Sequence, residues 1–183
     1  LDRATLAAAY RDNWLIRRII NAVPEEAMRR GFGEGLETPE FGRLNYERFA
    51  EGALLRAACL GSLMGGAGVY VGYRDGGADL TLPPAPGAEV SFLEVFHRYE
   101  LAAVEWSRVK DTSDPMYGRP MQWQVTGQNR TGLIFHESRM IKFPGQPRAD
   151  DFEFTAAIDR DWWDSILQSV WEDAQRYGVF WQA

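Results

Sequence analysis

The sequence predicts an α+β protein in which N-terminal helices are followed by a mostly antiparallel sheet and then by a C-terminal helix. Apolar residues recur at helical spacing in about the first third of the chain. From residue 67 onward, runs of Val, Ile, Tyr and Phe alternate with turn residues, as in strands, and helical spacing returns near the end. Because the helices flank the strands and do not alternate with them, we expect an α+β arrangement without βαβ units.

The length and composition fit a single domain. The chain has 183 residues, of which 45% are hydrophobic and 25% charged, as in globular proteins and unlike disordered chains. We expect one domain over 1–183, with a helical part at 1–63, a sheet part at 67–143 and a C-terminal helix at 160–178. Since the chain opens at Leu1 without an initiator methionine, we expect a piece of a longer product.

Three helices are predicted in the helical part. An amphipathic helix covers residues 6–23, where apolar side chains have near-helical spacing. Pro24 is expected to end that helix and to begin a short second helix that stops at Gly31, because proline is best accepted in a first helical turn. The Thr-Pro-Glu sequence at 38–40 predicts the start of a long helix that ends near Leu63.

Strand-forming residues dominate the sheet part. Residues 69–73 are strand formers bounded by glycines, whereas the proline-rich residues 82–87 predict a surface loop. Further strands are expected at 92–99, 103–109, 121–125, 133–135 and 140–143. The short turns between them imply antiparallel neighbours. The last helix is predicted to begin near Trp162 and to stop before Gly178.

The composition disfavours several function classes. Twenty Lys and Arg against 26 Asp and Glu give a net charge of -6, which disfavours a general nucleic-acid binder. No run of 18 apolar residues is present, so we expect no membrane span. Cys59 is the single cysteine, and His97 and His136 are the two histidines. An intrachain disulfide is therefore impossible and zinc ligands are scarce, so we expect neither a metal nor a cofactor.

One histidine motif could carry chemistry. His136-Glu137-Ser138 has the His-x-Ser pattern that forms an acid/base pair in a class of phosphoesterases when two such motifs face each other. His97 lacks a hydroxyl two positions later, other than the phenol of Tyr99. The alternative interpretation is that His136 ends a strand and hydrogen-bonds locally. We therefore expect no catalytic site, and a phosphodiester hydrolase that uses His136 is kept as an alternative function.

Glycines and acidic pairs have simpler interpretations. The glycine run at 65–68 lies between a helix and a strand, the wrong order for a phosphate-binding loop, and predicts a tight turn. Acids at Glu25-Glu26, Asp150-Asp151 and Asp159 with Asp161 could serve a glycosidase or a hard metal ion. Their positions at predicted helix starts or in loops favour a capping or solvent-exposed role.

Two groups of side chains are candidate contact surfaces. Arginines 11, 17, 18, 29 and 30 are mixed with acids, which favours a solvated or salt-bridged face over one that meets an acidic neighbour or a nucleic-acid backbone. Trp162 and Trp163 would point about 100° apart on a helix, so one of them should face something other than the local core. The candidate subunit contacts are Tyr10, Trp14, Arg17, Arg18, Trp162, Trp163 and Trp171.

Six stretches carry a family resemblance when taken in order. They are AYRDNWLIRRII at 9–20, PEEAMRRG at 24–31, LMGGAG at 63–68, FLEVFHRYEL at 92–101, DPMYGRP at 114–120 and IFHESRMIKFPG at 134–145. Together they resemble tailed-phage portal proteins, particularly a portal-like group common in prophages. Family members are much longer, so the resemblance implies that this chain is the N-terminal, wing-like portion.

The resemblance implies a structural protein that is not an enzyme. Portal subunits form a ring, typically of about a dozen copies, at a capsid vertex where DNA is packaged and ejected. The implied partners are other copies of the chain, terminase, a head–tail adaptor, capsid protein and double-stranded DNA passing without sequence specificity, with no membrane. The implied location is the virion, and the host bacterial cytoplasm during assembly. A monomeric portal-like adaptor is a further alternative.

Overall fold

A computed structural model describes five segments of the chain, and the helices and strands below lie in them. The described segments are residues 1–29, 50–76, 79–127, 132–147 and 161–180. The helices are α1 (Arg3–Asp12), α2 (Trp14–Arg29), α4 (Ala50–Met64) and α5 (Leu167–Phe180). The strands are β1 (Gly66–Arg74), β2 (Glu89–His97), β3 (Leu101–Ala103), β4 (Gln122–Val125), β5 (Ile134–His136) and β6 (Met140–Pro144).

The strands form two three-stranded sheets, and every pairing is antiparallel. The first sheet has the order β2-β1-β6, with Val69 of β1 opposite Val95 on one side and Ile141 on the other. The second sheet has the order β3-β4-β5, with Trp123 of β4 between Ala103 and Phe135. The expected α+β arrangement with antiparallel strands is confirmed. The division into two sheets was not predicted. It depends on the pairing of β6 with β1, and these two strands are far apart in the sequence.

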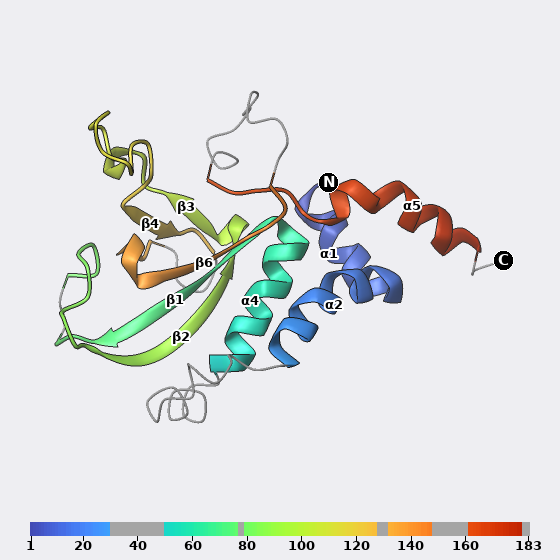
Figure 1. Cartoon of the computed structure of the whole chain (residues 1–183), viewed down its shortest axis with the longest axis horizontal. Coiled ribbons are helices and arrows are strands. Elements are labelled where there is room, and N and C mark those ends of the chain that lie inside the picture. Colours follow the sequence, from blue (N-terminus) through green and yellow to red (C-terminus); the bar gives the residue numbers. More distant parts are fainter. Residues whose placement is uncertain (30–49, 77–78, 128–131, 148–160, 181–183) are drawn as a thin grey trace.

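The elements are arranged in layers. Figure 1 shows α4 between α2 and the first sheet, while β3 and β4 lie on the other side of that sheet. Figure 1 also shows α5 projecting from the helical side of the molecule, beside α1 and α2. No helix among the described residues is long and apolar enough to cross a membrane.

Two hydrophobic clusters hold these layers together. The sheet cluster joins the facing surfaces of the two sheets, and the helical cluster joins α1, α2, α4 and α5. The buried members of the sheet cluster are Tyr70, Phe96, Leu101, Trp123, Val125, Phe135, Met140 and Trp162. The buried members of the helical cluster are Leu6, Ile16, Ile20, Leu63, Met64, Leu167 and Ala174.

The break between the first two helices lies at Asn13, and the prediction of a break at Pro24 is wrong. The Asn13 backbone is extended and its amide donates to the carbonyl of Ala9, which closes α1. Its side-chain oxygen then accepts from the amide of Leu15 at 2.9 Å, capping α2. Pro24 lies inside α2 and is buried on the same stripe as Ile20, so packing offsets the lost backbone hydrogen bond.

Other boundaries also differ from the expectations. The strand expected at 103–109 is limited to β3, because a 3₁₀ turn at Glu105–Ser107 follows it. The final helix begins at Leu167, so Trp162 lies before it. The third predicted helix ends at Met64, as expected, but its predicted start at 38–40 lies outside the described residues. The glycine turn is confirmed, with a positive φ of 81° at Gly65.

Candidate functional site

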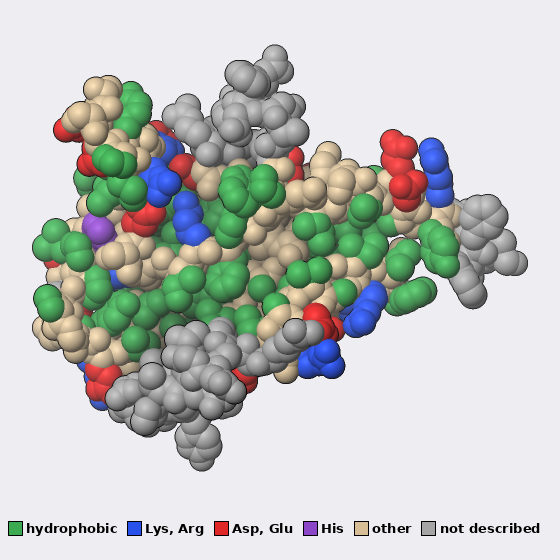
Figure 2. Space-filling view, viewed as in Figure 1, with side chains coloured by type: hydrophobic (Ala, Val, Ile, Leu, Met, Phe, Trp, Pro, Cys, Tyr) green, Lys and Arg blue, Asp and Glu red, His purple; other side chains and the backbone are tan. Residues whose placement is uncertain are grey.

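One exposed side of α2, which we call the α2 face, forms an open depression on the surface. The depression has a volume of about 360 Å³. It is lined by Trp14, Arg17, Arg18, Asn21 and Glu25, which are residues one turn apart along one side of the helix. Trp14 is 66% exposed, which is unusual for so large an apolar side chain. Figure 2 shows hydrophobic side chains exposed along this helical part of the molecule, with charged groups at its rim.

The corner between α1 and α2 orients this face. The Arg17 guanidinium donates to the carbonyl of Arg11 at 2.7 Å and lies over the Tyr10 ring, 5.8 Å from its centroid. The Tyr10 hydroxyl donates to the side-chain oxygen of Asn21 at 2.9 Å. Hydrogen bonds therefore hold the Tyr10 ring and the Arg17 guanidinium in fixed positions at this corner.

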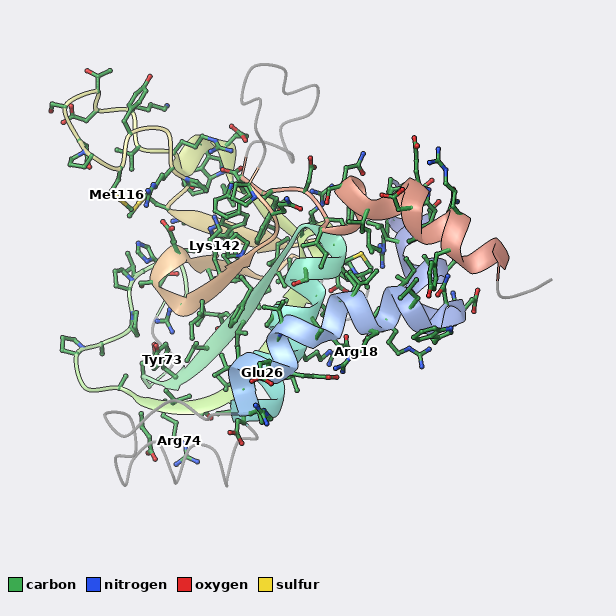
Figure 3. All side chains as sticks on the ribbon, turned by 45° about the vertical axis from the view of Figure 1, so that its right-hand side comes forward. Arg18, Glu26, Tyr73, Arg74, Met116 and Lys142 are labelled. Carbon is green, nitrogen blue, oxygen red and sulfur yellow. The ribbon has the colours of Figure 1, made fainter. Side chains whose placement is uncertain are left out.

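The arginines of these helices are paired on the surface. Arg18 lies 3.3 Å from Glu25, and Arg29 lies 2.7 Å from Glu26, with all four side chains well exposed. The prediction of a salt-bridged face is confirmed for these arginines, whereas Arg30 lies outside the described residues. Glu25 and Glu26 lie within α2, so their predicted role at a helix start is wrong. Exposed pairs are weak, so a partner can compete for Arg18, which Figure 3 shows projecting from α2.

Charge is distributed unevenly along the chain. Residues 1–29 contain five arginines and four acids, a net charge of +1. The remaining residues contain 15 basic and 22 acidic side chains, a net charge of -7. The α2 face therefore lies in a part of this acidic protein that has a small net positive charge, and its two arginines favour an acidic ligand.

The C-terminal tryptophans do not join the α2 face in one surface. Trp162 is only 3% exposed and its ring centroid lies 5.2 Å from that of Trp123, so its expected contact role is wrong because it belongs to the sheet cluster. Trp163 is 41% exposed. Its backbone amide donates a hydrogen bond to the carbonyl of Gly65, and its carbonyl accepts one from the guanidinium of Arg98. Trp171 packs against the helical cluster. One of the two adjacent tryptophans does face outward, but from an extended segment.

The two histidines have separate local partners. His136 ends β5, and its Nδ1 accepts from the backbone amide of Ser138 at 3.1 Å and lies 2.8 Å from the hydroxyl oxygen. Burial lowers the pKa of His136. His97 ends β2, with its Nε2 3.6 Å from a carboxylate oxygen of Glu100. The interpretation of His136 as a strand end with local hydrogen bonds is confirmed.

Two buried ion pairs were not predicted. Arg139 is fully buried and pairs with Asp75 at 2.5 Å, across 64 positions of sequence. Arg108 donates a hydrogen bond to Asp161 at 2.6 Å and another to Glu105. Both hydrogen bonds raise the pKa of Arg108, and the bond to Glu105 has the larger effect. The capping role expected for Asp161 is therefore wrong. Both pairs join segments distant in sequence, so no local pattern indicates them.

The described part of the chain offers little support for a metal site or a reactive thiol. Its His, Cys, Asp and Glu residues form no group of three or more that could hold a metal ion. Cys59 lies in α4, and burial raises the pKa of its thiol. The acids at 150–151 and 159 lie outside the described residues.

Comparison with known proteins establishes the family. A family model described as phage portal protein matches residues 4–179. The chain belongs to the phage portal protein family. This portal-family chain is also similar to two curated proteins named anti-CBASS protein Acb1. One, from Caulobacter sp. (strain RHG1), is 28% identical over 183 residues, covering 94% of this chain. The other, from Sphingomonas paeninsulae, is 32% identical over 182 residues, covering 93% of this chain.

These relatives correct the expected function. The portal-family chain spans 28% of the length of each relative, and both are named for action against CBASS. The expectation of a structural ring subunit at the capsid vertex is therefore wrong, although the family resemblance that suggested it is confirmed. The expected packaging and connector roles have no support. The expected ring, terminase, capsid and DNA partners, and the virion location, depended on that role and remain untested predictions.

Proposed function

We propose that this chain is the portal-related, non-catalytic part of a protein that acts against CBASS, and that it serves there as a binding scaffold inside the infected bacterium. The observation that carries the proposal is the similarity to two proteins of that name over more than nine-tenths of this chain. Because the chain spans 28% of each relative, the remaining length can hold other activities.

The α2 face supports the scaffold role. Exposed tryptophan and arginine side chains are the residues most enriched at energetically dominant positions of protein interfaces. Trp14 supplies an apolar anchor, and Arg17 and Arg18 supply charge in the cationic part of the chain. The matching partner is an acidic protein segment that carries an apolar side chain for the depression beside Trp14.

A protection assay tests this proposal. The intact protein, produced in bacteria that carry CBASS, should restore plating of a CBASS-sensitive phage. Trp14→Ala should lower that protection, because it removes the anchor without touching the core. Trp106→Ala is the matched control, since Trp106 is 68% exposed and lies in a different part of the molecule.

The outcomes separate the scaffold from a passive segment. Loss of protection with Trp14→Ala and retention with Trp106→Ala, at equal protein levels, supports the proposal. Equal protection by both variants would show that the α2 face is not needed for protection. Since an acidic partner is expected, charge reversal by Arg18→Glu should lower protection at least as strongly as Arg18→Gln.

A further inference from the structure

The α2 face is a strip of side chains that follows one side of a helix for about three turns. Trp14 and Glu25 at its two ends are eleven residues apart, which corresponds to about 16.5 Å along the helix axis. Figure 1 shows α2 on the outside of the molecule, with α4 between it and the first sheet. The strip is therefore long, narrow and open, a shape that an element lying along α2 would cover.

An occupant of this strip meets side chains and no free backbone edge. The backbone amides and carbonyls along this side of α2 take part in the hydrogen bonds of the helix itself. An extended peptide docked here would find no strand to pair with, and its covered backbone groups would lose their hydrogen bonds to water. An α-helix satisfies its own backbone groups and presents side chains alone. The geometry therefore favours a helical occupant.

The order of charges along the strip specifies the side chains of that occupant. Arg17 and Arg18 lie in the half of the strip next to Trp14, and Glu25 lies at the far end. Arg18 and Glu25 are seven residues apart, which is two helical turns, and their side chains are 67% and 47% exposed. A complementary helix carries carboxylates opposite the arginines and a basic side chain two turns away, opposite Glu25.

The two arginines differ in how they are held. Arg17 is fixed by its hydrogen bond to the carbonyl of Arg11 and by its position over the Tyr10 ring, and its guanidinium keeps further donors for a partner. Arg18 pairs with Glu25 at 3.3 Å, and an exposed ion pair of this kind contributes little free energy. A partner can therefore separate Arg18 from Glu25 at small cost, while Arg17 is already in place.

We propose that the α2 face binds an amphipathic α-helix of a partner protein. Carboxylates of that helix pair with Arg17 and Arg18, and a basic side chain two turns away pairs with Glu25. An apolar side chain fills the depression beside Trp14. The inference rests on the proposed role of the α2 face as a binding surface, and it adds the conformation and the charge pattern of the partner.

Two dye-labelled peptides test the conformation. The first is a designed helical peptide with Glu and, two turns later, Lys on one stripe that also carries leucine. The second has the same charges and a central proline, which breaks a helix. In fluorescence anisotropy titrations with the intact protein, the first peptide should bind at least about tenfold more tightly than the second. Equal affinities, or no binding of the helical peptide, would overturn the inference.

A charge exchange tests the pattern and the location. A third peptide has Glu in place of the Lys of the first. The parent protein should prefer the first peptide by up to about fivefold, whereas a Glu25→Arg protein should prefer the third. Trp14→Ala should weaken binding of the first peptide, and Trp106→Ala, which alters an exposed side chain elsewhere, should not. An unchanged preference in the Glu25→Arg protein would overturn the assigned charge pattern.

The protection assay keeps this inference separate from the proposed function. Loss of protection with Trp14→Ala, together with equal affinity for the helical and the proline peptides, would overturn the helical partner and leave the scaffold role in place. Full protection by Trp14→Ala would overturn the scaffold role, whichever peptide the protein binds.

Discussion

Replacing Asp75 by alanine would leave the guanidinium of Arg139 buried without its carboxylate. The Arg139 side chain has no exposed surface and that of Asp75 is 4% exposed. Besides the ion pair, Arg139 donates from Nε to the carbonyl of Leu82 at 3.0 Å and lies 5.7 Å from the Tyr73 ring centroid. Neither contact supplies a negative charge, and the Asp79 carboxylate that interacts electrostatically with Arg139 is exposed to solvent. The variant must therefore bury a poorly compensated cation or open the structure to hydrate it.

The expected loss of stability is large. Removing one partner of a buried pair costs about 3–5 kcal/mol. In a domain of this size each kcal/mol lowers the melting temperature by about 2–4 °C. The Tm of Asp75→Ala should therefore lie roughly 6–20 °C below that of the parent protein. Thermal and urea unfolding followed by circular dichroism would measure both quantities.

Two comparisons decide whether burial is the cause. Glu25→Ala breaks the exposed pair with Arg18 and should cost no more than about 1 kcal/mol. The double variant Asp75→Ala/Arg139→Met removes both charges and should recover part of the loss. A cost below about 1 kcal/mol for Asp75→Ala, or a double variant less stable than the single one, would refute this reasoning.

Three further predictions concern packing, helix stability and pH. A methyl group on Gly66 would clash with the Trp162 ring, so Gly66→Ala should destabilise by about 1–3 kcal/mol. Gly52 has open space in α4, so Gly52→Ala should stabilise by about 0.5–1 kcal/mol in the same urea titrations. Burial lowers the pKa of His97 below its ordinary 6.5, although Glu100 opposes this. The unfolded chain therefore binds the proton first, and stability should fall below about pH 6.5. A His97→Gln variant with the same pH profile as the parent would contradict this.

Local patterns in the sequence were sufficient for the order and type of most elements. The strand formers at 69–73 and the turn glycines before them lie where expected in β1. The same helical period placed four candidate contact residues of the first helices near one another, and their role in contacts stays a prediction. These are Tyr10, Trp14, Arg17 and Arg18, and they gather at one corner between α1 and α2.

Features that depend on tertiary context were missed. Pro24 has a local preference for a helix start, but burial on the stripe of Ile20 overrides it. Trp162 follows a helical pattern in the sequence. In the structure its ring packs over Gly66 and against Trp123, which places it in the sheet cluster. The pairing of Arg139 with Asp75 joins a 3₁₀ turn to the end of β1. Such contacts depend on how the sheets stack, which periodicity does not encode.

The main proposal is that this portal-family chain contributes to action against CBASS. The most direct measurement is the plating efficiency of a phage whose gene lacks the segment corresponding to residues 4–179, on matched hosts with and without CBASS. The account predicts normal plating on the host without CBASS and a loss on the host that carries it, restored by the intact gene. An equal loss on both hosts would contradict the account, because it would mean that the phage needs this segment whether or not CBASS is present.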